Sequence, residues 1–236
     1  MDIKKGKMVF DGRQKKTYST SDPDQYILQF KDDFSAFHDS TKKTLNHIGT
    51  YNTAISSALF KYLEGYHIHT HFIKVLKPNE MLVKKLEIIP VEIVVWNFSS
   101  GTISKRYGIE KGKIFPYPII EFYLKNKKLH NPMVTIDHVC AFGHAVPDEM
   151  QKIDQAARKI NAVLKSYFDR RDFKLADFKI EFGRHEQQIV LGDEMTPDTF
   201  HLWDVRIEGK QNMELVSFHS EHIEEEYEAL KNRICK

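Results

Sequence analysis

The stretch Asp177-Phe-Lys-Ile-Glu-Phe182 constrains the fold more than any other part of the sequence. Side chains alternate across a β-strand, so Asp177, Lys179 and Glu181 are expected on one face and the three apolar residues on the other. The apolar residues can anchor such a strand in a core. We therefore expect a strand that is buried on one face and presents two carboxylates around an ammonium group on the other.

A hairpin is expected to return further acidic residues toward the same face. Residues 183–188 predict a turn and residues 189–193 a second strand, which brings back Gly192-Asp-Glu194. Two or three carboxylates and a lysine in one place can hold Mg²⁺ and steady a phosphate. The alternative is a solvated face with an ordinary cross-strand ion pair, and the pattern alone leaves both interpretations open.

The remaining periodicities predict an α+β chain without internal repeats. Strands are expected at residues 8–10, 17–19, 26–30, 71–76, 81–87, 92–98, 119–123 and 173–182, besides the one at 189–193. Helices are expected at 52–63, before Gly108, from Pro147 to about 170, and from about 220 onward. Pro90 interrupts the apolar run and is the best candidate for a boundary between a smaller lobe, 1–89, and a larger lobe, 90–236.

Length and charge narrow the class of protein. A chain of 236 residues fits one medium domain or two small lobes. Its 35 Lys and Arg against 33 Asp and Glu give a net charge of +2, which offers no electrostatic reason for binding nucleic acid. The longest apolar stretch, 88–96, is far shorter than the roughly 20 residues of a membrane span. The two cysteines are far apart and form no CxxC pair, so we expect a cytoplasmic protein. From its charge and its short apolar stretches, we expect it to bind neither nucleic acid nor membrane.

Two further motifs are ambiguous on their own. In Asp11-Gly-Arg-Gln-Lys-Lys16, the glycine lets the backbone close over a polyphosphate, and the basic side chains can neutralise it. The same segment is also typical of an ordinary basic hairpin turn. His67-Ile-His-Thr-His71 has the alternation of a metal site, but no carboxylate or cysteine nearby completes it, so surface histidines are the favoured interpretation.

Taken in order along the chain, several motifs resemble the SAICAR synthetases of purine biosynthesis, from about Phe10 to Asp204. They are Gly12-Arg-Gln-Lys15, Phe30-Lys-Asp-Asp33 with Ala36-Phe37, His69-Thr-His-Phe72, Leu82-Val-Lys-Lys-Leu-Glu-Ile-Ile-Pro-Val-Glu92, Lys105-Arg-Tyr-Gly-Ile-Glu110, Glu121-Phe-Tyr-Leu-Lys125, Asp177-Phe-Lys-Ile-Glu-Phe-Gly183, Gly192-Asp-Glu-Met-Thr-Pro-Asp198 and Leu202-Trp-Asp204. So many ordered matches make the resemblance specific.

The resemblance implies an activity and a fold. Members of the family join the carboxylate of carboxyaminoimidazole ribotide to the amine of L-aspartate, using Mg-ATP and releasing ADP and phosphate. The implied fold is an α+β body of two lobes, related to ATP-grasp enzymes and protein kinases, with ATP in the cleft between the lobes. Family members are often homo-oligomers. Because a carboxylate is a poor acylating agent, ATP first converts it to an acyl phosphate, and the charge on the transferring phosphoryl group must be neutralised.

The resemblance also implies roles for individual residues. Glu181 and Asp193 would hold Mg²⁺. Lys125 and Lys179 would neutralise the transferring phosphate or the substrate carboxylate, with Asp177 orienting Lys179. The residues implied in ATP binding are Gly12, Arg13, Lys15, Lys84, Glu87 and Ile88.

Departures from the family pattern gather in the acceptor-substrate half. Trp96 and His201 replace arginines, Ile48 replaces a lysine, and the 217–220 run Ser-Phe-His-Ser replaces an arginine-rich run. Among the residues implied in ATP binding, Arg13 replaces a lysine and keeps the charge. In the family, several of these positions hold the 5′-phosphate of the ribotide. The positions at which we expect the acceptor substrate are Trp96, Thr102, Asn131, Asp198 and His201.

Three functions are compatible with this pattern. The first is a divergent ligase whose carboxylate substrate lacks the phosphoribosyl group, with Trp96 offering a flat apolar wall. The second is SAICAR synthetase itself, in which Trp96 fills core space and Lys105 or Arg106 binds the phosphate. The third is a nucleotide-binding module without catalysis; against it stands the retention of both metal carboxylates with Lys125 and Lys179. A plain structural domain would have no ATP affinity at all.

Overall fold

The protein, seen in a computed structural model that describes residues 3–34, 43–44, 46–206 and 222–236, divides into two compact units. Unit 1 comprises Met1–Gly65, Thr70–Leu86 and Ser217–Lys236, and unit 2 comprises Tyr66–His69 and Glu87–Val216. The chain passes from one unit to the other at Glu87, close to Pro90, but the C-terminal helix belongs with the N-terminal segment. The motif residues Ala36 and Phe37 and the departures at 217–220 lie outside the described residues.

Unit 1 is built on a five-stranded antiparallel sheet with the order β1-β2-β3-β7-β6. Its strands are β1 (Lys5–Asp11), β2 (Lys15–Thr20), β3 (Gln25–Phe30), β6 (Phe72–Lys77) and β7 (Glu80–Lys84), and a separate short pair joins β4 (Asp33–Phe34) to β5 (Lys43–Thr44). The strands that we predicted at 8–10, 17–19 and 26–30 are confirmed. The first two extend further at both ends, and the third begins one residue earlier.

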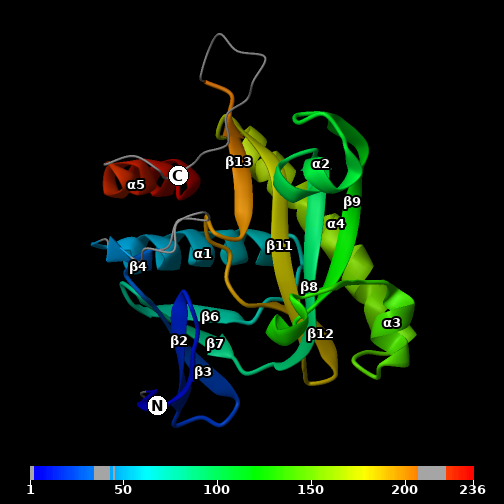
Figure 1. The fold of residues 1–236 in the computed structure, drawn as a ribbon. Coiled ribbons are helices and arrows are strands. Elements are labelled where there is room, and N and C mark those ends of the chain that lie inside the picture. Colours follow the sequence, from blue (N-terminus) through cyan, green and yellow to red (C-terminus); the bar gives the residue numbers. More distant parts are fainter. Residues whose placement is uncertain (1–2, 35–42, 45, 207–221) are drawn as a thin grey trace. The chain divides into compact units, whose positions relative to one another are not determined.

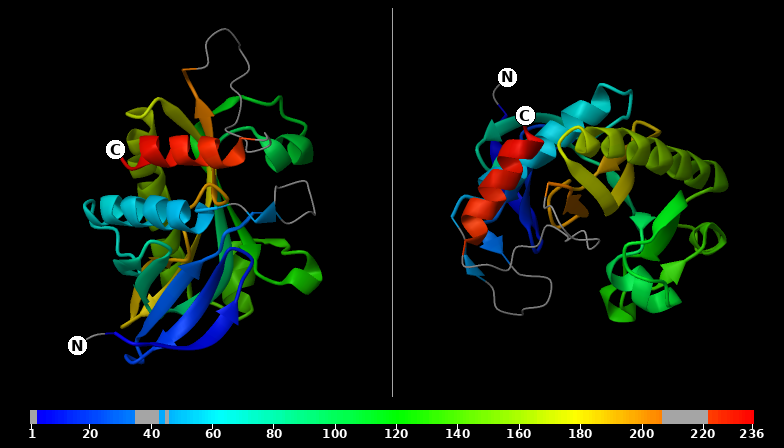
Figure 2. Two further views of the ribbon diagram at one scale, coloured as in Figure 1. Left: turned by 90° about the vertical axis from the view of Figure 1, so that its left-hand side faces the viewer. Right: turned by 90° about the horizontal axis from the view of Figure 1, so that it is seen from above.

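Two helices lie side by side in unit 1, as Figure 2 shows. Helix α1 (Ile48–Glu64) packs on β3, β6 and β7, and α5 (Ile223–Ile234) packs on α1. The apolar spacing at Ile55, Leu59 and Leu63 predicted α1, and all three side chains are fully buried. The helix begins four residues earlier than the apolar spacing indicated, at the position where Ile48 replaces the family's lysine, and the Ile48 side chain is buried.

Unit 2 contains an antiparallel sheet with the order β10-β9-β8-β11-β12, and β13 also pairs with β11 (Figure 1). Its elements are β8 (Glu87–Phe98), α2 (Gly101–Tyr107), β9 (Ile114–Leu124), the 3₁₀ turn η1 (Lys127–Leu129), β10 (Met133–Val134), α3 (Ile136–Ala141), α4 (Pro147–Asp169), β11 (Phe173–His185), β12 (Gln188–Gly192) and β13 (Phe200–Asp204). The β13 strand pairs with the first half of β11, and β12 pairs with the second half.

The apolar face of this sheet is covered by α4. Phe178, Ile180 and Phe182 on β11 are each no more than 2% exposed, and α4 packs across β11 and its neighbours. The predicted face of α4, which includes Ile160 and Leu164, is likewise fully buried. Burying one such side chain contributes about 1.5–3 kcal/mol, so the alternation in 177–182 fixes which face of β11 is covered.

The prediction that Pro90 separates two strands is wrong, because β8 continues through it. The register between β8 and β11 shifts between Glu181 and Gly183, which pair with Glu92 and Ile88, so β8 carries extra residues at Pro90. A bulge tolerates proline, which cannot donate to the sheet. On the other side, the Pro90 carbonyl accepts a hydrogen bond from the Lys125 amide at 2.9 Å, so pairing continues.

The α+β class is confirmed. No helix among the described residues is long and apolar enough to cross a membrane.

Candidate active site

The second face of the unit 2 sheet carries charged side chains in register. Glu181 of β11 lies opposite Glu92 of β8, which in turn lies opposite Tyr123 of β9. One step along, Lys179 lies in line with Glu121 of β9. Directly paired residues of antiparallel strands point to the same face, so the charged face predicted from 177–182 extends over three strands.

At one end of this face lies a carboxylate–lysine cluster, which consists of Glu92, Lys125, Lys179, Glu181 and Asp193. The Lys125 ammonium donates to Glu181 Oε2 at 2.5 Å, and the Lys179 ammonium donates to Glu92 Oε2 at 3.3 Å. Burial works against the charge on Lys125, but the nearby Glu181, Asp193 and Glu92 carboxylates outweigh it and raise the pKa of this ammonium group. Lys125 is therefore a permanent cation among carboxylates.

Two carboxylates of this cluster suit a magnesium ion. Glu181 is only 7% exposed. It pairs in register with Gly192, the residue before Asp193. Asp193 adopts the left-handed backbone conformation (φ 64°), which turns the chain just after β12. The described residues hold no group of three or more His, Cys, Asp or Glu placed to bind a metal. Mg²⁺ commonly takes one or two carboxylates and completes its shell with phosphate oxygens and water, so a pair fits.

Asp177 is buried between a histidine and a serine. It is 5% exposed; its Oδ1 lies 2.6 Å from His201 Nδ1, and its Oδ2 accepts a hydrogen bond from Ser100 Oγ at 2.7 Å. The β11–β13 register places His201 directly opposite Asp177. Although burial opposes a charge on His201, the hydrogen bond and charge of Asp177, with a contribution from Asp198, raise the pKa of the imidazole.

This arrangement corrects the expected orientation of Lys179 by Asp177. Within the described residues, the partner of the Lys179 ammonium is Glu92, and the side-chain partners of Asp177 are Ser100 and His201. Asp177 therefore orients the imidazole of His201 on this face.

A second group, the Glu121 cluster, consists of Trp96, Arg106, Glu121 and Tyr123. The Glu121 carboxylate is 6% exposed and accepts hydrogen bonds from Trp96 Nε1 at 2.9 Å and from the Tyr123 hydroxyl at 2.8 Å. It also receives Arg106 Nη2, at 2.5 Å from Oε1 and 2.6 Å from Oε2. Arg106 Nη1 donates in addition to the Tyr123 hydroxyl. A carboxylate this buried is stabilised only by such full pairing.

The Glu121 cluster changes the interpretation of Trp96. The residue is 6% exposed and its indole N–H is bonded to Glu121, so it has little surface left for a ligand ring. This favours the reading in which Trp96 fills space within the fold. Thr102 lies exposed on α2, while Asn131 lies exposed in the turn before β10 with a left-handed backbone (φ 49°). Neither of these two side chains is brought to the carboxylate–lysine cluster by a described contact.

The predicted nucleotide residues are divided between the units. In unit 1, Gly12 forms the tight turn between β1 and β2, where its amide donates to the Lys15 carbonyl at 2.9 Å. A Cβ added at Gly12 would lie 3.1 Å from that carbonyl and 3.1 Å from the Phe10 ring, so a larger residue would displace its neighbours. The Arg13 side chain makes no hydrogen bond to any described residue. Within the described part of the chain, the Lys84 ammonium donates to the Thr70 carbonyl at 3.4 Å and to no other group.

In unit 2, Glu87 and Ile88 open strand β8. Glu87 accepts a hydrogen bond from Arg184 at 2.8 Å and is otherwise exposed, and Ile88 is 44% exposed. An exposed isoleucine at the start of a strand is accessible to a ligand, and the contact of this segment with ATP stays a prediction.

Among the described residues, no group of three or more potential metal ligands includes the triple histidine. His67 and His69 are exposed, as expected for surface histidines, but His71 is buried and packs against the Phe60 ring at 5.1 Å between centroids. Among the described residues no third ligand joins them.

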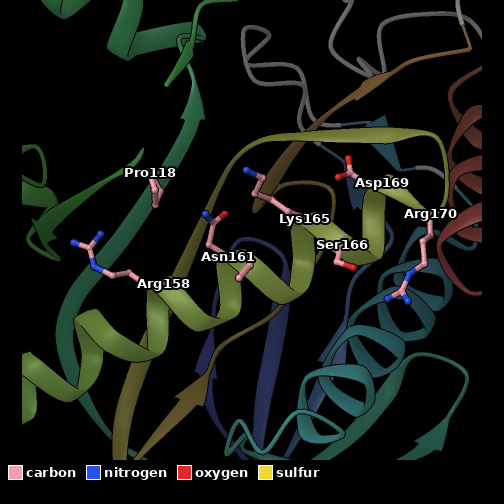
Figure 3. A pocket seen from close by; sticks show the side chains of 8 residues that line it. Pro118, Arg158, Asn161, Lys165, Ser166, Asp169 and Arg170 are labelled. Atoms are coloured by element: carbon pink, nitrogen blue, oxygen red, sulfur yellow. The ribbon is translucent and has the colours of Figure 1, made fainter. Parts of the chain in front are cut away.

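An open pocket of about 800 Å³ lies elsewhere in unit 2, beside α4 and β9 (Figure 3). It is lined by Pro118 of β9 and by α4 residues that include Arg158, Asn161 and Lys165. None of the predicted site residues lines it.

Three contacting residues of the site received no role from the sequence: Glu92, Ser100 and Glu121. Arg106 was named there, with Lys105, as a candidate for binding the phosphate. Glu92 and Glu121 lie within strands predicted from alternation, and each interrupts an apolar run on the face that faces away from the core. A carboxylate that interrupts an apolar run was the sequence signal that could have identified these two residues. Ser100 and Arg106 belong to α2 and its entry, whose placement against the sheet no local pattern could reveal.

Comparisons with known proteins agree with the geometry. The family model for SAICAR synthetase matches residues 8–228. A phosphoribosylaminoimidazole-succinocarboxamide synthase from Chloroherpeton thalassium is 42% identical over 232 residues, covering 98% of this chain and 99% of the relative.

Two solved structures have nearly the same fold. The phosphoribosylaminoimidazole-succinocarboxamide synthase from Ehrlichia chaffeensis superposes with a TM-score of 0.88 at 35% identity, over 97% of this chain and 98% of that one. A SAICAR synthetase in complex with ADP gives a TM-score of 0.88 at 36% identity, over 95% and 96% of the two chains. Because these matches run almost from end to end, the chain belongs to the SAICAR synthetase family, a family of ATP-dependent carbon–nitrogen ligases.

Proposed function

We propose that this protein is a phosphoribosylaminoimidazole-succinocarboxamide synthase, which joins carboxyaminoimidazole ribotide to L-aspartate and converts ATP to ADP and phosphate. The observation that carries the proposal is the carboxylate–lysine cluster, in which two lysines and three carboxylates lie together on one face of the sheet. Relatives that bear this enzyme's name match 98% of the chain, and they support the same conclusion.

Glu181 and Asp193 are the residues proposed to hold Mg²⁺. When bound, the metal neutralises charge on the phosphate groups of ATP. Lys125 already lies against Glu181, so its ammonium is in place to contact an anionic group beside the metal carboxylates. Lys179, which holds Glu92 only at 3.3 Å, is the more weakly bound of the two lysines and is proposed to bind the carboxylate that reacts.

The charge balance of the face supports a requirement for added cations. The described permanent cations here are Arg106, Lys125 and Lys179, whereas the carboxylates are Glu92, Glu121, Asp177, Glu181 and Asp193. Carboxylates thus outnumber cations, and such a face repels an anionic substrate. A divalent ion bound at these carboxylates offsets that excess of negative charge.

ATP is proposed to contact the turn at Gly12 with Arg13 and Lys15, together with Lys84, Glu87 and Ile88. A Cβ at Gly12 would lie tightly against the Lys15 carbonyl and the Phe10 ring. The Arg13 guanidinium makes no hydrogen bond to a described residue, so it is available to bind phosphate. We also place the enzyme in the cytoplasm. The homo-oligomer implied by the family stays a prediction that sedimentation can test.

A divergent ligase is the second candidate, because Trp96 and His201 stand where the family has arginines. The Trp96 indole donates one hydrogen bond to Glu121 and carries no charge. A ligase for a carboxylate without the 5′-phosphate would need no arginine at these positions.

One incubation distinguishes the candidates. The enzyme is mixed with Mg-ATP, carboxyaminoimidazole ribotide and L-aspartate, and ADP release and product mass are followed. Formation of the succinocarboxamide at an enzymatic rate supports the proposed function. ATP binding without amide formation contradicts it and directs the search to carboxylates lacking the phosphate. If no carboxylate in a panel stimulates ADP release, the protein is a nucleotide-binding module.

A further inference from the structure

Arg106 is a cation on the charged face whose guanidinium is held by several hydrogen bonds. Its guanidinium is fixed by the buried Glu121 carboxylate and the Tyr123 hydroxyl, and the Tyr107 and Tyr123 rings lie 5.0 and 5.9 Å from it. The side chain nevertheless stays 30% exposed. The printed bonds use Nη1 and Nη2 only, so within the described residues the Nε–H has no partner. A held but partly exposed guanidinium can receive an anion without reordering.

The position of Arg106 relative to the reacting groups determines how far apart two anionic groups of the substrate must be. Glu121, which holds Arg106, lies two strands across from Lys179 in the same register, and two strands are separated by roughly 10 Å. Glu181 lies two residues further along, which makes its separation from Glu121 roughly 12 Å. A substrate that reacts beside Lys179 and also reaches Arg106 must therefore carry a second anionic group roughly 10 Å from its reacting carboxylate.

We infer that Arg106 is a specificity-determining residue, which binds an anionic group at the far end of the acceptor substrate. This inference rests on the proposed function, and in that reaction the anionic group is the 5′-phosphate of the ribotide. Trp96 contributes indirectly: its N–H satisfies Glu121 without adding charge, so Arg106 remains the sole permanent cation bound to that carboxylate among the described residues. In this chain the guanidinium group on this face therefore belongs to Arg106 of α2, whereas the β8 position holds Trp96.

The test compares two substrates, the ribotide and the corresponding riboside without its phosphate, by kcat/KM. In the wild type the ribotide should be preferred. Arg106→Gln should lower kcat/KM for the ribotide by about 10- to 100-fold, mainly through KM, and leave that for the riboside unchanged. Arg106→Lys should retain part of the preference, because lysine keeps the charge but loses the fork. Lys111→Gln, which removes an exposed cation beyond the same helix, is the matched control and should leave the preference intact.

Several outcomes would overturn the inference. The first is a ribotide preference that Arg106→Gln leaves unchanged. The second is loss of the preference in Lys105→Gln, which would show that Lys105 binds the anion. Arg106→Gln also leaves Glu121 buried without its counter-charge, so the double variant Arg106→Gln/Glu121→Gln guards against misfolding. It should show the same lost preference with a melting temperature close to that of the wild type.

The inference can fail separately from the proposed function. If the wild type forms no succinocarboxamide, the proposed function is contradicted, and calorimetric binding of the ribotide and the riboside to the Mg-ADP-loaded protein then tests Arg106 alone. Tighter binding of the ribotide that Arg106→Gln abolishes supports the inference. Equal affinities for the two ligands, or a ribotide affinity that the substitution leaves unchanged, contradict it.

Discussion

Glu181 and Asp193 are expected to be indispensable, because both are proposed to hold the metal ion. Glu181→Gln and Asp193→Asn preserve shape and remove one negative charge each, so either should lower kcat by at least about 100-fold with little change in fold. The measurement is ADP release at increasing Mg²⁺, alongside circular dichroism. Glu186→Gln, an exposed carboxylate in the β11–β12 turn, is the control. Full activity of either metal-site variant would contradict the assignment.

His201 should make the free energy of unfolding depend on pH. Burial acts to lower the pKa of its imidazole, but the hydrogen bond and charge of Asp177, with Asp198 adding to them and Lys179 opposing them, raise it overall. A raised folded-state pKa means that the native state binds the proton more tightly. The resulting stabilisation is complete below the unfolded-state pKa, about 6.5, and is lost as pH rises through the folded-state value.

The measurement is urea unfolding between pH 5.5 and 9. The wild type should lose stability across the upper part of this range, and His201→Gln should flatten that slope. His69→Gln removes an exposed histidine of the same unit and should leave the wild-type slope. A slope that is the same in His201→Gln and the wild type would show that Asp177 does not retain the proton on this imidazole.

Sequence reasoning found the residues of the site whose strand alternation is strict. Asp177, Lys179 and Glu181 were placed on one face by a period of two, and the structure has them there. The partners of those residues were harder to find, since Lys179 bonds Glu92 from another strand and Asp177 bonds His201 from a third. Register between strands distant in sequence decides such pairs, and no local pattern encodes that register.

At the scale of elements, α4 and β11 stabilise each other through their apolar faces. Leu164→Ala should lower the free energy of unfolding by about 2–5 kcal/mol, because Leu164 is fully buried and its truncation leaves a cavity. Lys165→Ala, at the next and exposed position of the same helix, should change it by less than about 0.5 kcal/mol. Chemical denaturation of the two variants measures the difference. Equal effects would mean that α4 does not carry this core.

Elements with long periodic patterns were predicted well, and short ones were not. The helix from Pro147 had a proline at its first position and one apolar face, and it was found within a residue at each end. Helix α3 and strand β13 were missed, since six and five residues contain too few repeats to establish a period. Strand β8 was split at Pro90 because the bulge that accommodates a proline depends on the partner strand.

At the scale of the whole molecule, unit 1 is assembled from segments that lie far apart in sequence. Helix α5 follows the whole of unit 2 along the chain, yet it packs on α1. A division into 1–89 and 90–236 treats the chain as two consecutive blocks, and composition offers no signal for a returning segment. The contact between α1 and α5 is made by side chains with unremarkable helical spacing, so only the three-dimensional structure assigns α5 to unit 1.

That return predicts that the C-terminus stabilises the N-terminal unit. Tyr227 is 1% exposed, and its hydroxyl donates to the buried Asn52 Oδ1 at 2.7 Å. Tyr227→Ala should lower the free energy of unfolding of unit 1 by about 3–5 kcal/mol, and Tyr227→Phe, which removes only the hydrogen bond, by about 1–2 kcal/mol. The exposed neighbour Glu228→Ala is the control.

Hydrogen exchange of the α1 amides is the appropriate measurement for these variants. Both tryptophans, Trp96 and Trp203, belong to unit 2, so tryptophan fluorescence does not report on unit 1. Protection of α1 should fall in the order wild type, Tyr227→Phe, Tyr227→Ala, because each step removes more of the surface that α5 contributes. If α1 kept its full protection in Tyr227→Ala, α5 would be a passive appendage, and unit 1 would draw its stability from its sheet alone.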